Sequence, residues 1–276
     1  MTISEQMMYS TLLITMLDDR NQVIGTGTGF MFAFCSSETS MIPALVSNQH
    51  VLCKCRAIRV SFTRKSDNGM PMHGTIDSVI IDMRAVIPHP NPNIDLAILP
   101  MAPTIQDLSG HGRPPFYITL DRHLIPSKQV WDGLDAIEDV TMVGYPHGLY
   151  DSFNNLPIFR QGITASHPKF NFGGEPKFLV DMACYPGSSG SPVFIHNRFG
   201  FSDPKNNSIS LGQRTLFLGI QHAAPISHEI GDLISFDTTR PVVKPVTRSF
   251  YNIGYIVKST ELLVFDSILM GITKHN

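Results

Sequence analysis

A glycine-rich bend at residues 186–192 offers one serine hydroxyl for nucleophilic chemistry. It reads Pro-Gly-Ser-Ser-Gly-Ser-Pro and runs directly into an apolar segment at 193–195. Glycines on both sides of Ser189 permit backbone angles that other residues resist, and they let a substrate carbonyl approach the backbone closely. If Ser189 attacks, its own N–H and that of Gly187 would point at the developing oxyanion. The alternative is a Gly/Ser-rich hairpin turn.

A histidine follows one apolar stretch, and an aspartate precedes another. His50 follows the stretch 44–46, where a lone histidine is usually structural; Asp95 precedes the stretch 96–99, where a lone aspartate is usually a turn residue. A buried carboxylate needs a donor partner, and an imidazole N–H would satisfy it. Because a serine hydroxyl needs a base and that base needs an orienting carboxylate, His50, Asp95 and Ser189 together predict a catalytic triad.

The composition is that of a compact globular protein. The 276 residues are 42% hydrophobic and 16% charged, and a chain of this length suits two packed β-barrels. The formal net charge is −2, so no basic field favours a nucleic acid partner. No stretch approaches the roughly 18 consecutive apolar residues of a membrane span, so we expect no membrane partner either.

The first residues lack the basic segment and apolar run of a secretory signal, which predicts a cytoplasmic location. Cys35, Cys53, Cys55 and Cys184 are then expected to be free thiols, because that compartment is reducing. Cys53 and Cys55 could form half of a zinc site, but no second pair at metal-ligand spacing accompanies them. We therefore expect neither a metal nor another cofactor.

Short apolar runs bounded by Gly, Pro, Asn or Asp follow one another along the chain and predict an all-β fold. Short helices are expected at 131–138 and 259–269. The region 104–137 is rich in Pro, Gly, Asp and Lys and reads as a connection between two halves. We therefore divide the chain into an N-terminal barrel (1–115) and a second unit (116–276). The second unit contains the connection, a C-terminal barrel and a short C-terminal helix.

Six short motifs follow one another along the chain. They are Gly-Thr-Gly-Phe at 27–30, Val-Ser-Asn-Gln-His-Val at 46–51, Asp-Leu-Ala-Ile-Leu at 95–99, Val-Gly-Tyr-Pro at 143–146, the segment 181–192, and Ile-Gly-Tyr-Ile-Val at 253–257. In this order they closely resemble the trypsin-like (chymotrypsin-fold) serine peptidase family, and in particular its bacterial HtrA-like branch. The chain order His, Asp, Ser also differs from that of subtilisins and α/β-hydrolases. The resemblance implies two packed, six-stranded antiparallel β-barrels with the active site between them, and a serine endopeptidase activity.

Three features depart from the family pattern, two of them in ways that bear on regulation. Ser188 stands where trypsin-type zymogens carry the aspartate that pairs with a newly cut N-terminus, so we expect no activation by N-terminal cleavage. We expect no PDZ module after the second barrel, and hence no regulation by such a module. Ser191 replaces the family's second glycine, which still permits the bend.

By the same resemblance, small or neutral residues wall the pocket for the P1 side chain. With no charge at Ala183, a basic P1 side chain would lack a counter-ion, so we expect a small or medium apolar P1 residue. Gln221 could instead hydrogen-bond a polar P1 group, and Cys184 is expected only to line the wall. The predicted pocket residues are Ala183, Cys184, Tyr185, Gln221, His222, Ala223, Gly254 and Ile256.

The expected partner is a protein or peptide substrate, with a regulatory protein as a further possibility. Two long segments, 197–214 and 225–251, flank the predicted cleft and could gate it. Two alternatives stay open. The chain could be a catalytically silent trypsin-like fold used as a binding module, or a hydrolase of other acyl substrates.

Overall fold

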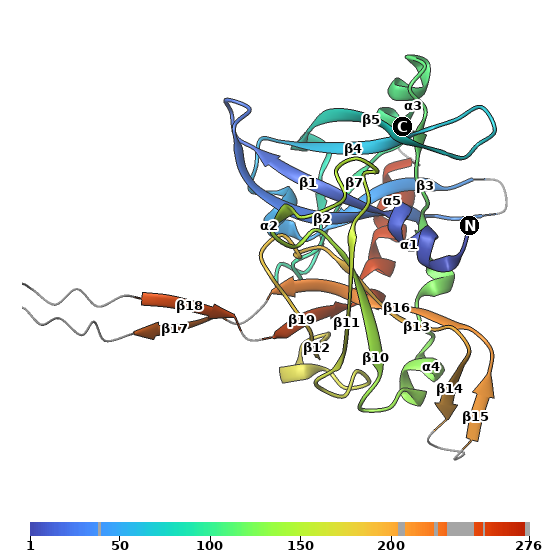
Figure 1. Cartoon of the computed structure of the whole chain (residues 1–276), viewed down its shortest axis with the longest axis vertical. Coiled ribbons are helices and arrows are strands. Elements are labelled where there is room, and N and C mark those ends of the chain that lie inside the picture. Colours follow the sequence, from blue (N-terminus) through green and yellow to red (C-terminus); the bar gives the residue numbers. More distant parts are fainter. Residues whose placement is uncertain (38–39, 204–207, 224–225, 231–245, 251, 274–276) are drawn as a thin grey trace, which may run out of the picture.

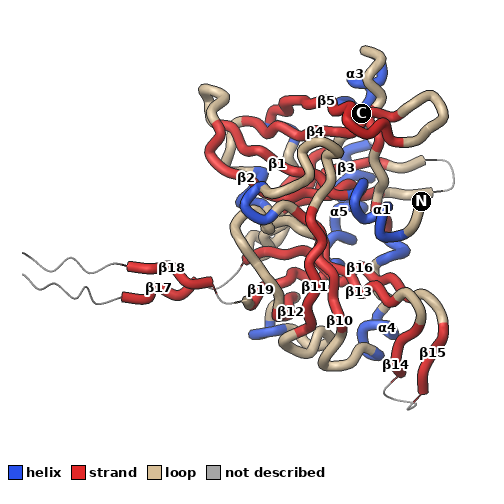
Figure 2. The backbone as a smooth tube through the Cα atoms, in the orientation of Figure 1, coloured by secondary structure: helices blue, strands red, loops and turns tan. Residues whose placement is uncertain are grey.

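A computed structural model describes residues 1–37, 40–203, 208–223, 226–230, 246–250 and 252–273 of the chain. An N-terminal sheet and a C-terminal barrel lie one above the other in Figure 1, and Figure 2 shows that strands dominate both. This arrangement confirms the predicted all-β fold. Part of the predicted gating segments, including 231–245, lies outside the described residues.

The N-terminal sheet has six longer strands and three strands of two residues. The strand order is β5-β4-β1-β2-β3-β7-β6, with β8 paired to β4 and β9 paired to β2. The longer strands match the predicted number of six. They are β1 (Thr11–Leu17), β2 (Val23–Phe34), β3 (Ile42–Ser47), β4 (Ala57–Lys65), β5 (Pro71–Asp82) and β7 (Ala97–Pro100). The short strands are β6 (Ile87–Pro88), β8 (Pro115–Phe116) and β9 (Leu120–Asp121).

The C-terminal half is a closed barrel of six strands in the order β10-β11-β12-β19-β16-β13. These strands are β10 (Asp139–Gly144), β11 (Ile158–Thr164), β12 (Lys177–Asp181), β13 (Pro192–Asn197), β16 (Arg214–Ala223) and β19 (Ile253–Lys258). Two hairpins stand apart from the barrel as two-stranded sheets. They are β14 (Gly200–Asp203) with β15 (Ser208–Leu211), and β17 (Ile226–Ile230) with β18 (Val246–Phe250).

Because β8 and β9 pair with the N-terminal sheet, the connection to the barrel begins after Asp121, slightly later than the predicted boundary at 115. The connection contains the helix α4 (Lys128–Gly133), where the sequence predicted a helix at 131–138. Ser127 explains the earlier start, because its side chain accepts a hydrogen bond from the Val130 N–H and so caps the helix.

The remaining helices are short. The predicted C-terminal helix is a 3-10 turn followed by an α-helix, and the sequence patterns do not predict α1, α2 or α3. Among the described residues, no helix is long and apolar enough to cross a membrane. The α-helices are α1 (Ile3–Ser10), α2 (Gln49–Leu52), α3 (Ala102–Gly110) and α5 (Val264–Thr273). The 3-10 turns are η1 (Met83–Ala85), η2 (Arg122–Leu124), η3 (Pro146–Gly148), η4 (Phe172–Gly174) and η5 (Ser259–Leu263).

One apolar cluster joins the two halves. Phe30 of β2 packs edge-on against Phe217 of β16, with ring centroids 5.3 Å apart, and Phe194 of β13 lies 5.4 Å from the same ring. Phe265 of α5 completes the contact from the C-terminal end of the chain. All four rings are fully buried, so the two halves pack through a shared core. This packing fixes the position of the N-terminal sheet relative to the C-terminal barrel.

Candidate active site

His50 and Asp95 meet at one end of two neighbouring strands. β3 pairs with β7 in the register Ser47↔Ala97. After β3 the chain turns into α2, which contains His50, while Asp95 lies just before β7. The side chain of Asn48 ties the two loops together, because its Nδ2 donates a hydrogen bond to the backbone oxygen of Asp95 at 2.8 Å.

The Asp95 carboxylate binds His50 through both of its oxygens. The backbone N–H of His50 donates to Oδ1 at 2.8 Å, and the ring Nδ1 lies 2.5 Å from Oδ2. The backbone bond fixes the orientation of the carboxylate. The ring contact favours the tautomer with the proton on Nδ1, which leaves Nε2 as the basic atom of a neutral ring. That is the arrangement a general base needs.

A second imidazole contacts the same carboxylate. Nδ1 of His222 lies 2.7 Å from Oδ2 of Asp95, and the His50 and His222 ring centroids are 6.3 Å apart. Burial alone would raise the pKa of Asp95, but hydrogen bonds from His222 and His50 outweigh burial and hold that pKa well below its usual range. Asp95 is therefore ionised at neutral pH.

The position of His222 corrects the sequence prediction, which placed its side chain in the pocket wall. The β16–β19 pairing shifts register between Gln221 and Ala223, so a β-bulge falls at His222. A bulge re-aims the side chain it contains, and here the imidazole turns toward Asp95.

His50, Asp95 and His222 also form a group of described residues whose possible ligand atoms lie within 4.8 Å of one another. Two imidazoles and a carboxylate are a donor set that zinc accepts. Both Nδ1 atoms, however, already contact the same carboxylate oxygen, so a cation would have to displace the protons of both hydrogen bonds. The hydrogen bonds account for the cluster without a metal.

The N-terminal sheet holds the bend that carries Ser189. The Thr28 N–H of β2 donates to the Ser189 carbonyl at 2.8 Å, and Ser47 Oγ donates to the Thr28 carbonyl at 2.6 Å. Gly190 follows with φ +89°, and a Cβ there would lie 1.9 Å from that Thr28 oxygen. Only glycine fits this approach, which brings Ser189 to the end of β3 that precedes His50.

The Ser189 hydroxyl donates to the backbone oxygen of His222 at 3.5 Å, which is a long contact. The hydrogen bonds of the described residues do not join Ser189 to the His50 ring. Catalytic hydrogen bonds are often long or unformed before substrate binds. The structure thus forms the His50–Asp95 pair completely and places Ser189 nearby.

Two backbone N–H groups of the bend, those of Gly187 and Ser189, have no acceptor among the described residues. The carbonyl of Pro186 accepts a hydrogen bond from the His147 N–H at 2.6 Å. Because the C=O and N–H of a trans peptide point in opposite directions, the Gly187 N–H points away from His147. Thr28 Oγ1 donates to the Gly187 carbonyl at 2.8 Å and holds this geometry. Two free N–H donors on one bend suit an oxyanion hole.

The predicted pocket residues divide by exposure. Three of them, Ala183, Tyr185 and Ala223, are at least partly exposed and are available to a substrate. The other predicted members besides His222 have buried side chains, so they could border the predicted pocket only from within the barrel wall; they are Cys184, Gln221, Gly254 and Ile256.

Strand pairing explains the buried set. Gln221 lies opposite Ile256 in the β16–β19 ladder, so both side chains share one face, and they are 2% and 0% exposed. Cys184 packs against Gly254, where a Cβ would lie 2.5 Å from the sulfur. Burial raises the pKa of Cys184 to about 11, so this thiol is a poor nucleophile at neutral pH.

Arg160 of β11 contacts the bend, although no sequence motif marks it. Its Nη1 donates to the backbone oxygen of Ala183 at 2.8 Å and to Ser188 Oγ at 2.6 Å. The four cysteines are free, as the sequence predicts.

No curated protein matches the chain. Among solved structures, the chain is similar to the Rv3671c protease from M. tuberculosis in its active form. That match covers 94% of this chain and 80% of the other, at 14% sequence identity and a TM-score of 0.45. The profile of the family described as a trypsin-like peptidase domain matches residues 27–198, which is more than half of the chain and includes His50, Asp95 and Ser189. The chain therefore belongs to the trypsin-like peptidase family.

Proposed function

We propose that the protein is a serine endopeptidase that uses Ser189 as nucleophile, His50 as general base and Asp95 as the residue that orients the histidine. The observation that carries the proposal is the pair of hydrogen bonds from His50 to the two Asp95 oxygens, beside a bend that presents Ser189. Family membership supports peptide bonds as the substrate class. A protein or peptide is therefore the proposed partner.

In the proposed reaction, substrate binding replaces the contact of Ser189 with the His222 oxygen by a hydrogen bond to Nε2 of His50. Nε2 takes the hydroxyl proton as Oγ attacks the scissile carbonyl, and the proton then passes to the leaving amine. The N–H groups of Gly187 and Ser189 stabilise the oxyanion. Water enters the same cycle to hydrolyse the acyl group on Ser189. Asp95 stays ionised throughout and stabilises the imidazolium.

The same site supports a small or medium apolar P1 residue. Ala183 and Ala223 supply small side chains at partly exposed positions, and neither provides a counter-ion for a basic group. Gln221 is too deeply buried to reach a polar P1 group without a rearrangement.

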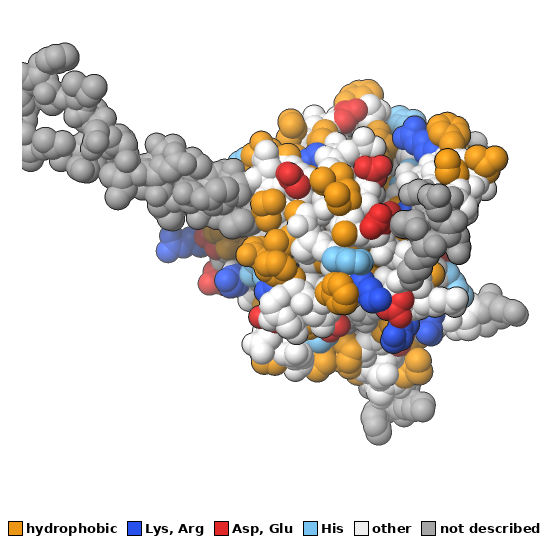
Figure 3. Space-filling view, turned by 90° about the horizontal axis from the view of Figure 1, so that it is seen from below, with side chains coloured by type: hydrophobic (Ala, Val, Ile, Leu, Met, Phe, Trp, Pro, Cys, Tyr) orange, Lys and Arg blue, Asp and Glu red, His pale blue; other side chains and the backbone are white. Residues whose placement is uncertain are grey.

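We also propose a cytoplasmic location, which four unpaired cysteines fit. Figure 3 shows acidic and basic side chains interspersed on the face around the lower end of the barrel. Together with the net charge of −2, this distribution gives no reason to propose a nucleic acid partner.

Labelling with a fluorophosphonate tests the proposal directly. The wild type should form a covalent adduct that peptide mapping places on Ser189, and it should cleave peptides from a mixed library. Ser189→Ala should form no adduct and lose nearly all turnover while melting at the same temperature, because the members of a catalytic unit fail together. A wild type that neither labels nor cleaves would favour the silent binding module.

A further inference from the structure

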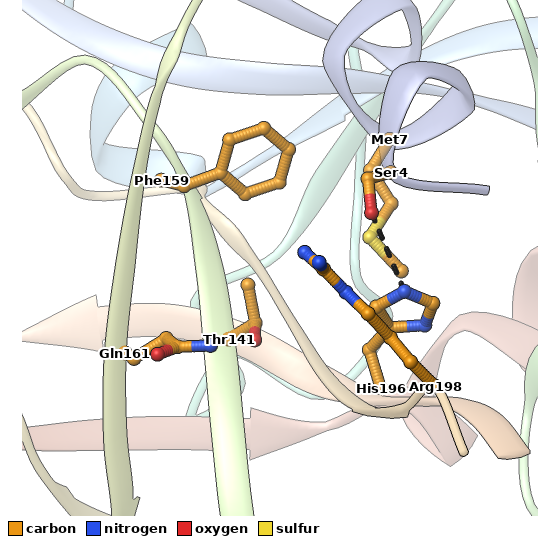
Figure 4. Close-up of a pocket in the computed structure, with 7 residues that line it drawn as sticks. All are labelled: Ser4, Met7, Thr141, Phe159, Gln161, His196 and Arg198. Carbon is orange, nitrogen blue, oxygen red and sulfur yellow. Dashed lines mark hydrogen bonds between the residues drawn. The ribbon is translucent and has the colours of Figure 1, made fainter. Parts of the chain in front are cut away.

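The guanidinium of Arg160 points into the interior of the C-terminal barrel. Its neighbours on β11, Phe159 and Gln161, line a cavity of about 340 Å³ that residues of α1 also border (Figure 4). Successive side chains on a strand point to opposite faces, so Arg160 points to the other face. Its register partner Met142 is 0% exposed and belongs to the barrel core.

A cation in this position needs an explanation, because the surrounding core is apolar. Burial is the largest influence on Arg160 and lowers its pKa. Its Nε and Nη2 atoms are buried, and among the described residues they have no hydrogen-bond partner and Arg160 forms no ion pair. Its register partner Met142 and the nearby Cys184 both belong to the apolar cluster that fills this barrel. If the only role of Arg160 were to fill the core, an apolar side chain would stabilise the barrel more than a charged group with unpartnered nitrogens does.

The bonds that Arg160 does make all reach one loop. Nη1 binds the Ala183 carbonyl and the Ser188 hydroxyl, which bracket the segment between β12 and Ser189. Ser188 is itself fully buried, and its N–H donates to the Tyr185 carbonyl at 3.0 Å. Arg160 thus ties the start of the loop to the residue that separates Gly187 from Ser189, the two candidate oxyanion donors.

We propose that Arg160 is a positioning residue that holds the oxyanion bend in its competent conformation. The inference rests on the proposed serine peptidase function. A charged donor makes shorter and stronger hydrogen bonds than a neutral one, so a single guanidinium nitrogen can restrain both ends of a short loop. Nη1 binds the bend and the Nε and Nη2 atoms are buried, so the guanidinium nitrogens are not directed at a substrate side chain, and Arg160 acts through the backbone of the bend.

Replacing Arg160 by an apolar side chain of similar length tests the proposal. Arg160→Met removes both bonds and suits the apolar core. We expect kcat to fall on the order of 10²-fold, the lower end of the effect of losing an oxyanion-hole donor, with a smaller change in KM. Gln161→Met is the matched control, because it alters the same strand on the opposite face and should leave kcat unchanged.

A transition-state analogue separates positioning from folding. A peptide aldehyde forms a tetrahedral adduct whose oxyanion uses the Gly187 and Ser189 N–H groups, whereas the cleaved product peptide does not. The affinity of Arg160→Met for the aldehyde should therefore fall in parallel with kcat, and its affinity for the product should stay the same. If Arg160→Met melts at a lower temperature but keeps wild-type kcat and aldehyde affinity, Arg160 is a structural residue and the proposal is wrong.

Ser188 provides a second route that does not depend on the folding of Arg160→Met. Ser188→Ala removes one acceptor and should lower kcat by about tenfold through the same loss of aldehyde affinity. Ser188→Asp offers the Arg160 guanidinium a carboxylate and should keep wild-type kcat. When Ser188→Asp is added to Arg160→Met, the carboxylate has no cation to bind, and kcat should fall below that of Arg160→Met alone. Wild-type kcat in Ser188→Ala would count against the proposal. Failure of the wild type to react with a fluorophosphonate would instead overturn the serine peptidase assignment, and this inference with it.

Discussion

Asp95→Asn should inactivate the enzyme while preserving its fold, because the hydrogen bonds at this position fix how the asparagine amide is oriented. Oδ1 accepts the backbone N–H of His50, so the asparagine oxygen must take that place. Its NH₂ group then lies where Oδ2 was, between Nδ1 of His50 and Nδ1 of His222. Two N–H donors meet two ring acceptors, and every group stays satisfied.

That arrangement forces the wrong tautomer on His50. When Nδ1 accepts a hydrogen bond, the proton of the neutral ring must sit on Nε2, which can no longer take the proton of Ser189. The equivalent change in a serine protease triad lowers kcat by about 10⁴, or about 5 kcal/mol of transition-state stabilisation. We expect a loss of that order here, with little change in melting temperature.

The assay is kcat on a library-derived peptide substrate, with protein concentration set by absorbance and folding checked by circular dichroism. Asp121→Asn is the matched control, because Asp121 caps a 3-10 turn at the start of the connection and should leave kcat unchanged. A loss of less than about tenfold in Asp95→Asn would refute the tautomer argument and point to another orienting group.

Three further predictions follow from titration and charge. The pKa of Asp95 is lowered on folding, so its stabilising contribution is complete above the unfolded value of about 3.9 and is lost as the pH falls through the folded value. Urea unfolding in this acid range should therefore show a steeper loss for the wild type than for Asp95→Asn. Burial raises the pKa of Cys184 to about 11, so the folded protein keeps a proton that the unfolded chain loses above about pH 8.5. Stability should fall between these values, and Cys184→Ala should flatten that decline. Finally, peptides with Lys or Arg at P1 should be cleaved much more slowly than those with Val, Ala, Leu or Met, and a library profile dominated by basic P1 residues would refute the pocket assignment.

Much of the fold could be predicted because its signals are local. Runs of apolar residues between turn residues identify most strands, and the glycines around Ser189 mark a bend that other residues resist. The helix α1 was missed although its signal was present: Thr2 and Glu5 form a capping box at its start. The helix predicted at 131–138 begins earlier, at Lys128, because the Ser127 side chain caps it there.

Residue type and order also sufficed to select His50, Asp95 and Ser189, because a serine nucleophile requires a base and the base requires a carboxylate. The sequence could not show which residues far away in the chain contact these three side chains. Asp95 and His222 are 127 positions apart, and only the β-bulge in β16 turns the second imidazole toward the carboxylate. Likewise, strand pairing buries Gln221, and the closed barrel brings Arg160 to the bend. Local patterns determined which groups could react, whereas strand register and barrel closure decided which groups orient them, because those contacts depend on packing between distant segments.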